Sequence, residues 1–144
     1  MSTRSGPPPP APPPKVLLVD DDIGVVHTFF RMLKFLGYEV SIARDAEQGL
    51  QQLDASEFDV VLLDFRMPLA DGLAFLRRVR THQRQSEIPV AVVTGDYFVD
   101  PAVVAELQAL GASLHFKPLS IDDLVGIIQR LLEPEPKGTG DPAG

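Results

Sequence analysis

The sequence contains no cysteine. This absence excludes disulfide bonds, thiolate metal sites and cysteine nucleophiles, and it agrees with a cytoplasmic location. No apolar run approaches the roughly 20 residues that a membrane-spanning helix needs, so we expect no membrane insertion. The opening stretch, MSTRSGPPPPAPPP, lacks the apolar segment of a secretory signal, and we therefore expect no export by that route.

An excess of basic residues is also missing. The 144 residues carry a formal net charge of −7 at pH 7, and the lysines and arginines form no dense block. Because binding to a phosphate backbone needs a positive surface, direct contact with nucleic acid is disfavoured. Apolar residues make up 44% and charged residues 23%, which is typical of a soluble globular protein with one compact core.

The prolines divide the chain. Of 14 prolines, seven lie within residues 7–14, three lie in the tail, and only four lie between them. The first run is predicted to form an extended polyproline II arm, which could act as a spacer or as a ligand for an aromatic-lined groove. We expect a Pro-rich disordered arm over residues 1–14, one domain over 15–133 and a disordered tail over 134–144.

Two hydrophobic periods alternate within residues 15–133. Five short runs rich in β-branched residues predict strands at 16–19, 40–43, 60–63, 90–93 and 112–116. Several of these runs are apolar without alternation, as expected of parallel strands that are covered on both faces.

Helical spacing marks the segments between these runs. The first helix is predicted to end at Gly37 and to have one apolar stripe. The stripe consists of Val26, Phe29, Phe30, Leu33 and Leu36. The second helix is predicted to open with a capping box made by Asp45 and Gln48. The third is predicted to follow Asp71 and Gly72.

The last two helices have equally clear start signals. Asp100 is predicted to cap the fourth helix, with Pro101 at its first position, and Ser120 is predicted to begin the fifth. Five strands and five helices then alternate strictly. With right-handed crossovers, this pattern predicts an α/β, flavodoxin-like fold, a doubly wound five-stranded parallel sheet of order 2-1-3-4-5. Such sheets bind ligands beyond the carboxyl ends of their strands.

Charged and hydroxyl side chains stand at those strand ends. They are Asp20, Asp21 and Asp22 after the first run, Asp64 after the third, Thr94 after the fourth and Lys117 after the fifth. If strands 1 and 3 are neighbours, Asp20, Asp21 and Asp64 converge. Carboxylates so close repel one another unless a hard cation neutralises them, and Mg²⁺ suits a site of few carboxylates plus water.

Lys117 and Thr94 would add a positive charge and a hydroxyl donor from the adjoining strands. Together the residues predict an electropositive binding site for a phosphoryl group, next to a carboxylate nucleophile. Each residue alone has a structural explanation, as a loop acid, a helix cap or a surface lysine. Their occurrence at the ends of different strands, on one edge of the sheet, favours a functional site.

Four segments carry a family resemblance: VLLVDDD (16–22), DVVLLDFRMPLADG (59–72), VVTG (92–95) and FKPL (116–119). From Lys15 to about Leu132, the chain resembles the receiver domain of two-component response regulators, in particular the single-domain, chemotaxis-regulator-like receivers. The resemblance implies that Asp64 is the phosphoacceptor. It also implies a Mg²⁺ ion bound by Asp21, Asp64 and the backbone carbonyl of Arg66, with Asp20 bound to the ion directly or through water.

The resemblance implies further that Thr94 and Lys117 contact phosphoryl oxygens and that the Lys117–Pro118 bond is cis. The phosphoryl group would come from a phosphohistidine on a sensor histidine kinase or a histidine phosphotransfer protein. A downstream effector protein would read the phosphorylated surface. Such a domain is a switch with at most weak autophosphatase activity, and not an enzyme in the usual sense.

Leu114 departs from the family pattern, because members usually carry tyrosine or phenylalanine three residues before the lysine. The resemblance therefore does not extend to an aromatic rotamer switch at this position. Strand alternation places His115 on the opposite side from Leu114, where a packed histidine is expected. A separate hypothesis concerns Arg66 and Asp96, which would overhang the site. They could pair across its mouth and prolong the life of the phosphoryl group, or remain two solvated charges.

Two rival functions stay open at this point. A degenerate receiver would act as an interaction module without phosphorylation, and only Leu114 favours that interpretation. A haloacid-dehalogenase-type phosphatase would use Asp20 as nucleophile and Asp22 as acid or base, with Thr94 and Lys117 in support. That class needs acidic metal ligands on a further strand, which the sequence lacks, and it leaves Asp64 unexplained.

Overall fold

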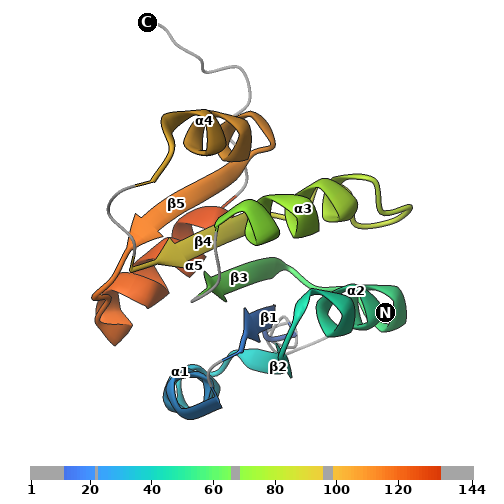
Figure 1. Cartoon of the computed structure of the whole chain (residues 1–144). Helices are drawn as coiled ribbons and strands as arrows, with labels where there is room; N and C mark the ends of the chain where they lie inside the picture. The colour runs from blue at the N-terminus through green and yellow to red at the C-terminus, as the bar shows by residue number, and fades with distance from the viewer. Residues whose placement is uncertain (1–11, 22, 66–68, 96–98, 134–144) are drawn as a thin grey trace, which may run out of the picture.

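The computed structural model describes residues 12–133 except 22, 66–68 and 96–98, and it describes only the backbone at 23–27, 64, 65, 69 and 70. Strands and helices alternate along the chain (Figure 1). The strands are β1 (Lys15–Asp20), β2 (Glu39–Ala43), β3 (Val60–Phe65), β4 (Val90–Thr94) and β5 (Ala112–Phe116). The helices are α1 (Ile23–Phe35), α2 (Ala46–Ala55), α3 (Leu69–Arg80), α4 (Pro101–Ala109) and α5 (Ile121–Leu132).

The five strands form one parallel sheet of order β2-β1-β3-β4-β5, which confirms the predicted topology. Alternate residues of β1, β3 and β4 enter two separate core clusters. Leu17 and Val19 pack with side chains of α2, α3 and α4, whereas Val16 and Leu18 pack with those of α1 and α5. Both faces of the sheet are therefore covered, as the continuous apolar runs predict (Figure 1). In the described part of the chain, no helix has the length and hydrophobicity to cross a membrane.

Three strands, β1, β3 and β4, extend further at their carboxyl ends than predicted. Parallel pairing continues to Asp20 opposite Asp64, and to Phe65 opposite Thr94. Asp20 and Thr94 are therefore the last residues of β1 and β4, and Asp64 is the residue before the last in β3. The hydrogen-bonded backbone of the sheet fixes the spacing of these three residues.

The predicted start of the third helix is wrong. Helix α3 begins at Leu69, so Asp71 lies in its first turn and Gly72 is buried within the helix. An acidic residue in the first turn is favoured by the helix dipole and need not mark the cap.

The predicted capping box of α2 forms only in part. Asp45 accepts a hydrogen bond from the Gln48 N–H at 2.8 Å, as expected. The side chain of Gln48, however, accepts from the Arg44 N–H at 2.8 Å, one residue before the cap. The longer glutamine side chain reaches past the capping residue. A complete reciprocal box occurs instead at α5, between Ser120 and Asp123.

The apolar stripe predicted for the first helix is wrong at Leu36. Helix α1 ends at Phe35, and Gly37 turns the chain with φ of 99°. Leu33 is fully buried, but Leu36 lies beyond the helix and is 52% exposed. Gly37, in the left-handed conformation, ends the helical periodicity directly after Leu36.

Two helical glycines should respond in opposite ways to alanine. At Gly126, a Cβ atom would meet nothing within 4 Å, so Gly126→Ala should stabilise the fold by about 0.5–1 kcal/mol. At Gly49, a Cβ would lie 3.1 Å from the buried ring of Phe75 and 3.3 Å from Val19. Gly49→Ala should therefore destabilise by about 1–3 kcal/mol. Urea unfolding measures the free energy of unfolding of both variants. Equal changes in this free energy would contradict the close packing of α2 on Phe75.

Candidate functional site

The carboxyl edge of the sheet brings β1 and β3 together. Adjacent parallel strands lie about 4.8 Å apart, and the register sets Asp20 directly opposite Asp64. Asp20 is 2% exposed and Asp21 is exposed. The side chain of Asp64 lies outside the described residues, as do Asp22, Arg66 and Asp96. The predicted pairing between Arg66 and Asp96 therefore remains a prediction.

Strands β4 and β5 supply the other half of this edge. Thr94 is 3% exposed and pairs with Phe65 on one side and Phe116 on the other. The Lys117 N–H donates to the Thr94 carbonyl at 2.8 Å, which ties the lysine to the end of β4. The Lys117–Pro118 peptide bond is cis, as the resemblance implies.

Gly95, for which no role was predicted, adjoins the lysine. A Cβ atom at Gly95 would lie 4.0 Å from Cδ of Lys117. The alkyl chain of Lys117 therefore passes beside the glycine, and a larger side chain there would crowd it. The spacing of VVTG before the lysine is the only signal of this contact in the sequence.

The oxygen donors at this edge fit a hard divalent cation. A buried carboxylate at Asp20 next to the exposed carboxylate of Asp21 concentrates negative charge, and Mg²⁺ prefers one or two carboxylates with water and carbonyl oxygens. No group of three His, Asp or Glu side chains suited to a metal occurs among the described residues, a set that leaves out the Asp64 carboxylate.

The side chains of Leu114 and His115 lie on opposite faces of β5, as predicted. Leu114 is half-buried against the core cluster of α2, α3 and α4. His115 is half-buried, and its Nε2 lies 2.9 Å from Oγ of Ser113. Burial, and then the charge of Arg130 on α5, hold the pKa of His115 below its ordinary value. The histidine is thus a packed residue of the α5 face.

This histidine should make stability sensitive to acid. Because the folded pKa is below the unfolded value of about 6.5, the full stability is present above that pH and is lost as the pH falls toward the folded pKa. His115→Gln removes the titrating group. Urea unfolding across about pH 8 to 5 should show a steeper loss for the wild type than for the variant. Parallel curves would contradict the assignment.

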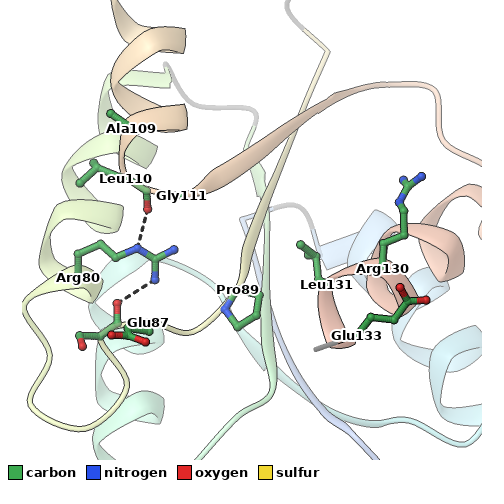
Figure 2. Close-up of a pocket in the computed structure, with 10 residues that line it drawn as sticks. Arg80, Glu87, Pro89, Ala109, Leu110, Gly111, Arg130, Leu131 and Glu133 are labelled. Atoms are coloured by element: carbon green, nitrogen blue, oxygen red, sulfur yellow. Dashed lines mark hydrogen bonds between the residues drawn. The ribbon is translucent and has the colours of Figure 1, made fainter. Parts of the chain in front are cut away.

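A cavity of about 650 Å³ lies at the opposite, amino edge of the sheet. Figure 2 shows Arg80 and Leu110 on one wall and Arg130 and Leu131 on the other. Arg80 donates to the Leu110 carbonyl at 2.7 Å and to the Ile88 carbonyl at 2.6 Å. These bonds link the loop before β4 to the end of α4. The cavity is thus remote from the carboxyl edge.

Comparison with known proteins gives consistent matches. The family model for the response regulator receiver domain matches residues 16–129. The transcriptional regulatory protein ZraR of Escherichia coli K12 is 34% identical over 112 residues, covering 78% of this chain and 25% of ZraR. The transcriptional regulatory protein PrrA of Mycobacterium leprae is also 34% identical over 112 residues, covering 78% of this chain and 47% of PrrA. The chain thus spans less than half the length of these two relatives.

Solved structures agree in fold. The chemotaxis protein CheY4 of Vibrio cholerae superposes with a TM-score of 0.74 at 31% identity, covering 83% of this chain and 99% of CheY4. The receiver domain of the sensor histidine kinase PA1611 of Pseudomonas aeruginosa PAO1, solved with magnesium coordinated in its active-site cleft, gives a TM-score of 0.71 at 25% identity, with 83% and 98% covered. The family match over most of the domain, and a solved relative covered almost end to end, show that this chain belongs to the response regulator receiver domains of two-component systems.

Proposed function

We propose that this receiver domain takes a phosphoryl group from a phosphohistidine onto Asp64, with Mg²⁺, and signals the change to a partner protein. The observation that carries the proposal is the register of β1 and β3, which sets Asp20 opposite Asp64 at the edge where Thr94 and Lys117 also lie. Two carboxylates, a hydroxyl group and an ammonium group, from β1, β3, β4 and the residue after β5, thus lie at one edge of the sheet.

In the proposed transfer, a carboxylate oxygen of Asp64 attacks phosphorus and the N–P bond of the phosphohistidine breaks. The released histidine nitrogen takes a proton. Thr94 donates its hydroxyl to one phosphoryl oxygen, and the Lys117 ammonium pairs with another. The donor is a sensor histidine kinase or a histidine phosphotransfer protein, and this places the chain in the cytoplasm, where such kinases draw on ATP.

Asp20, Asp21, Asp64 and the Arg66 carbonyl would hold the Mg²⁺. Bound there, the ion supplies positive charge that offsets the negative charges of the carboxylates and the phosphoryl group. The magnesium in the cleft of the PA1611 receiver supports this assignment. We also propose that residues 15–133 form the receiver, between a Pro-rich arm over 1–14 and a tail over 134–144, and that hydrolysis within the domain is at most a weak autophosphatase activity.

Lys117→Met should slow phosphorylation from a small acyl phosphate by roughly 10²–10³-fold, the usual cost of losing one preorganised charge partner. The substitution keeps an unbranched apolar chain beside Gly95, with sulfur in place of Cδ, and removes the ammonium group. The rate of adduct formation, followed by intact mass, measures the effect. Lys34→Met, at an exposed position on α1, is the matched control. Equal rates for the two variants would contradict the role of Lys117.

The experiment that tests the proposed function uses the full chain with a small acyl phosphate, with and without Mg²⁺. A single phosphoryl adduct that forms only with Mg²⁺ is expected in the intact mass. Beryllofluoride, which mimics the phosphoryl group, should shift the NMR signals of Thr94 and Leu114. Absence of both the adduct and the shifts would instead support the degenerate receiver, the alternative that Leu114 alone favours.

A further inference from the structure

The end of α1 exposes three large apolar side chains side by side. Met32, Phe35 and Leu36 are 39%, 89% and 52% exposed. Leu36 follows the last residue of α1, but its N–H still donates to the Met32 carbonyl at 3.1 Å, so the backbone keeps helical spacing up to Leu36. Positions i, i+3 and i+4 are neighbours on such a surface, so the three side chains form one patch, called here the α1 patch. A contiguous apolar patch of this kind marks an interaction surface more often than three isolated residues do.

The start of the domain lies close to the α1 patch. The Pro14 carbonyl accepts a hydrogen bond from the Glu39 N–H at 2.9 Å. Glu39 follows the turn that ends α1, in which the Tyr38 N–H donates to the Leu33 carbonyl at 3.0 Å. Glu39 is four positions after Phe35, so their Cα atoms are at most about 15 Å apart. Residues 7–14, if extended, reach about 25 Å, which is more than the span requires.

The chemistry of residues 7–14 suits the α1 patch. The sequence PPPPAPPP is uncharged, apolar and held extended by its rings, so docking costs it little conformational entropy. Extended proline segments bind surfaces that present aromatic rings, and Phe35 presents one that is 89% exposed. Covalent attachment also gives the arm a high effective concentration at a surface within its reach.

The charges around the α1 patch disfavour a second copy of the chain as occupant. Arg31 and Lys34 flank the patch and are both exposed. A two-fold contact through this patch would bring each cation close to those of the other copy. Residues 7–14 carry no charge and meet no such repulsion.

We propose that residues 7–11 dock on the α1 patch of the same chain, with the exposed Pro12 and Pro13 as the connection to Pro14, so that Met32, Phe35 and Leu36 form an intramolecular polyproline-binding site. The site lies at the amino edge of the sheet, because α1 runs back from the carboxyl edge and Pro14 is bonded beside it. The docked arm therefore closes the α1 patch to other partners and leaves the carboxyl edge open. The site does not depend on phosphorylation of Asp64.

A tryptophan reporter tests the docking. The chain has no tryptophan, so the emission of a Phe35→Trp variant comes from the α1 patch alone. A second version of the full chain carries this substitution and also serine at each proline of residues 7–13. Contact on one face of a ring roughly halves its accessible area. Acrylamide quenching should therefore be about twofold stronger with the serine arm, and emission should move to longer wavelength.

Two controls make the result decisive. Gln51→Trp, at an exposed position of α2 on the other face of the sheet, should quench equally with either arm. A chain with its native patch, labelled at the methionine methyl groups, should show the Met32 signal moving between the two arms while that of Met67 stays. Quenching at position 35 that is independent of the arm would overturn the proposal. So would protection that disappears on dilution, because it would assign the α1 patch to a second copy.

Discussion

Asp64→Asn is expected to take up no phosphoryl group from a small acyl phosphate, with a rate at least about 100-fold below that of the wild type. The amide of asparagine matches the carboxylate in shape but is not a nucleophile towards phosphorus. The fold should persist, because the substitution removes one negative charge from the edge where Asp20 is already buried. Intact mass after incubation with Mg²⁺ measures the loss.

The matched control for this variant is Asp122→Asn, at an exposed position in the first turn of α5. It makes the same chemical change away from Asp20 and Asp64, and the variant should be phosphorylated at the same rate as the wild type. An adduct on Asp64→Asn that equals that of the control would mean that another residue is the phosphoacceptor.

Gln85→Leu is expected to lower the free energy of unfolding by about 3–5 kcal/mol. Gln85 is only 7% exposed, and its amide nitrogen donates to the carbonyls of Leu53 and Ser56 at 2.7 Å each. Its amide oxygen accepts from the Phe58 N–H at 2.8 Å. Leucine would leave three backbone groups without their partner in a region that water reaches poorly, between the end of α2 and the start of β3.

Gln83→Leu is the matched control, because Gln83 lies two residues away in the same loop and is exposed. Its effect should stay within about 0.5 kcal/mol. Urea unfolding followed by circular dichroism compares the two variants. A loss below 1 kcal/mol for Gln85→Leu, or equal losses in both, would show that the buried amide does not hold this junction together.

The sheet and its carboxyl edge could be predicted because their signals are local. Apolar runs without alternation identify buried parallel strands, and strict alternation with helices indicates a doubly wound sheet with right-handed crossovers, for which 2-1-3-4-5 is one of the common strand orders. The residues that close each strand then share one edge. The predictions for Asp20, Thr94 and Lys117 rest on this logic, and the observed register agrees with it.

Contacts set by tertiary packing could not be predicted in the same way. Gln85 stands in the polar run THQRQSE, where nothing distinguishes the one buried glutamine from its exposed neighbours. Gly49 looks like a weak point of a helix, yet it marks the close approach of α2 to Phe75. Leu36 fits a helical stripe, but the helix ends one residue earlier. Each outcome depends on which surfaces meet in the fold.

The central claim is that Asp64, and no other carboxylate at this edge, carries the phosphoryl group. Borohydride reduces an aspartyl phosphate to homoserine, so peptide mass spectrometry after phosphorylation and reduction identifies the modified position. The account predicts conversion at Asp64 alone, dependent on Mg²⁺. Conversion at Asp20 would contradict it and favour the phosphatase-type chemistry in which Asp20 is the nucleophile.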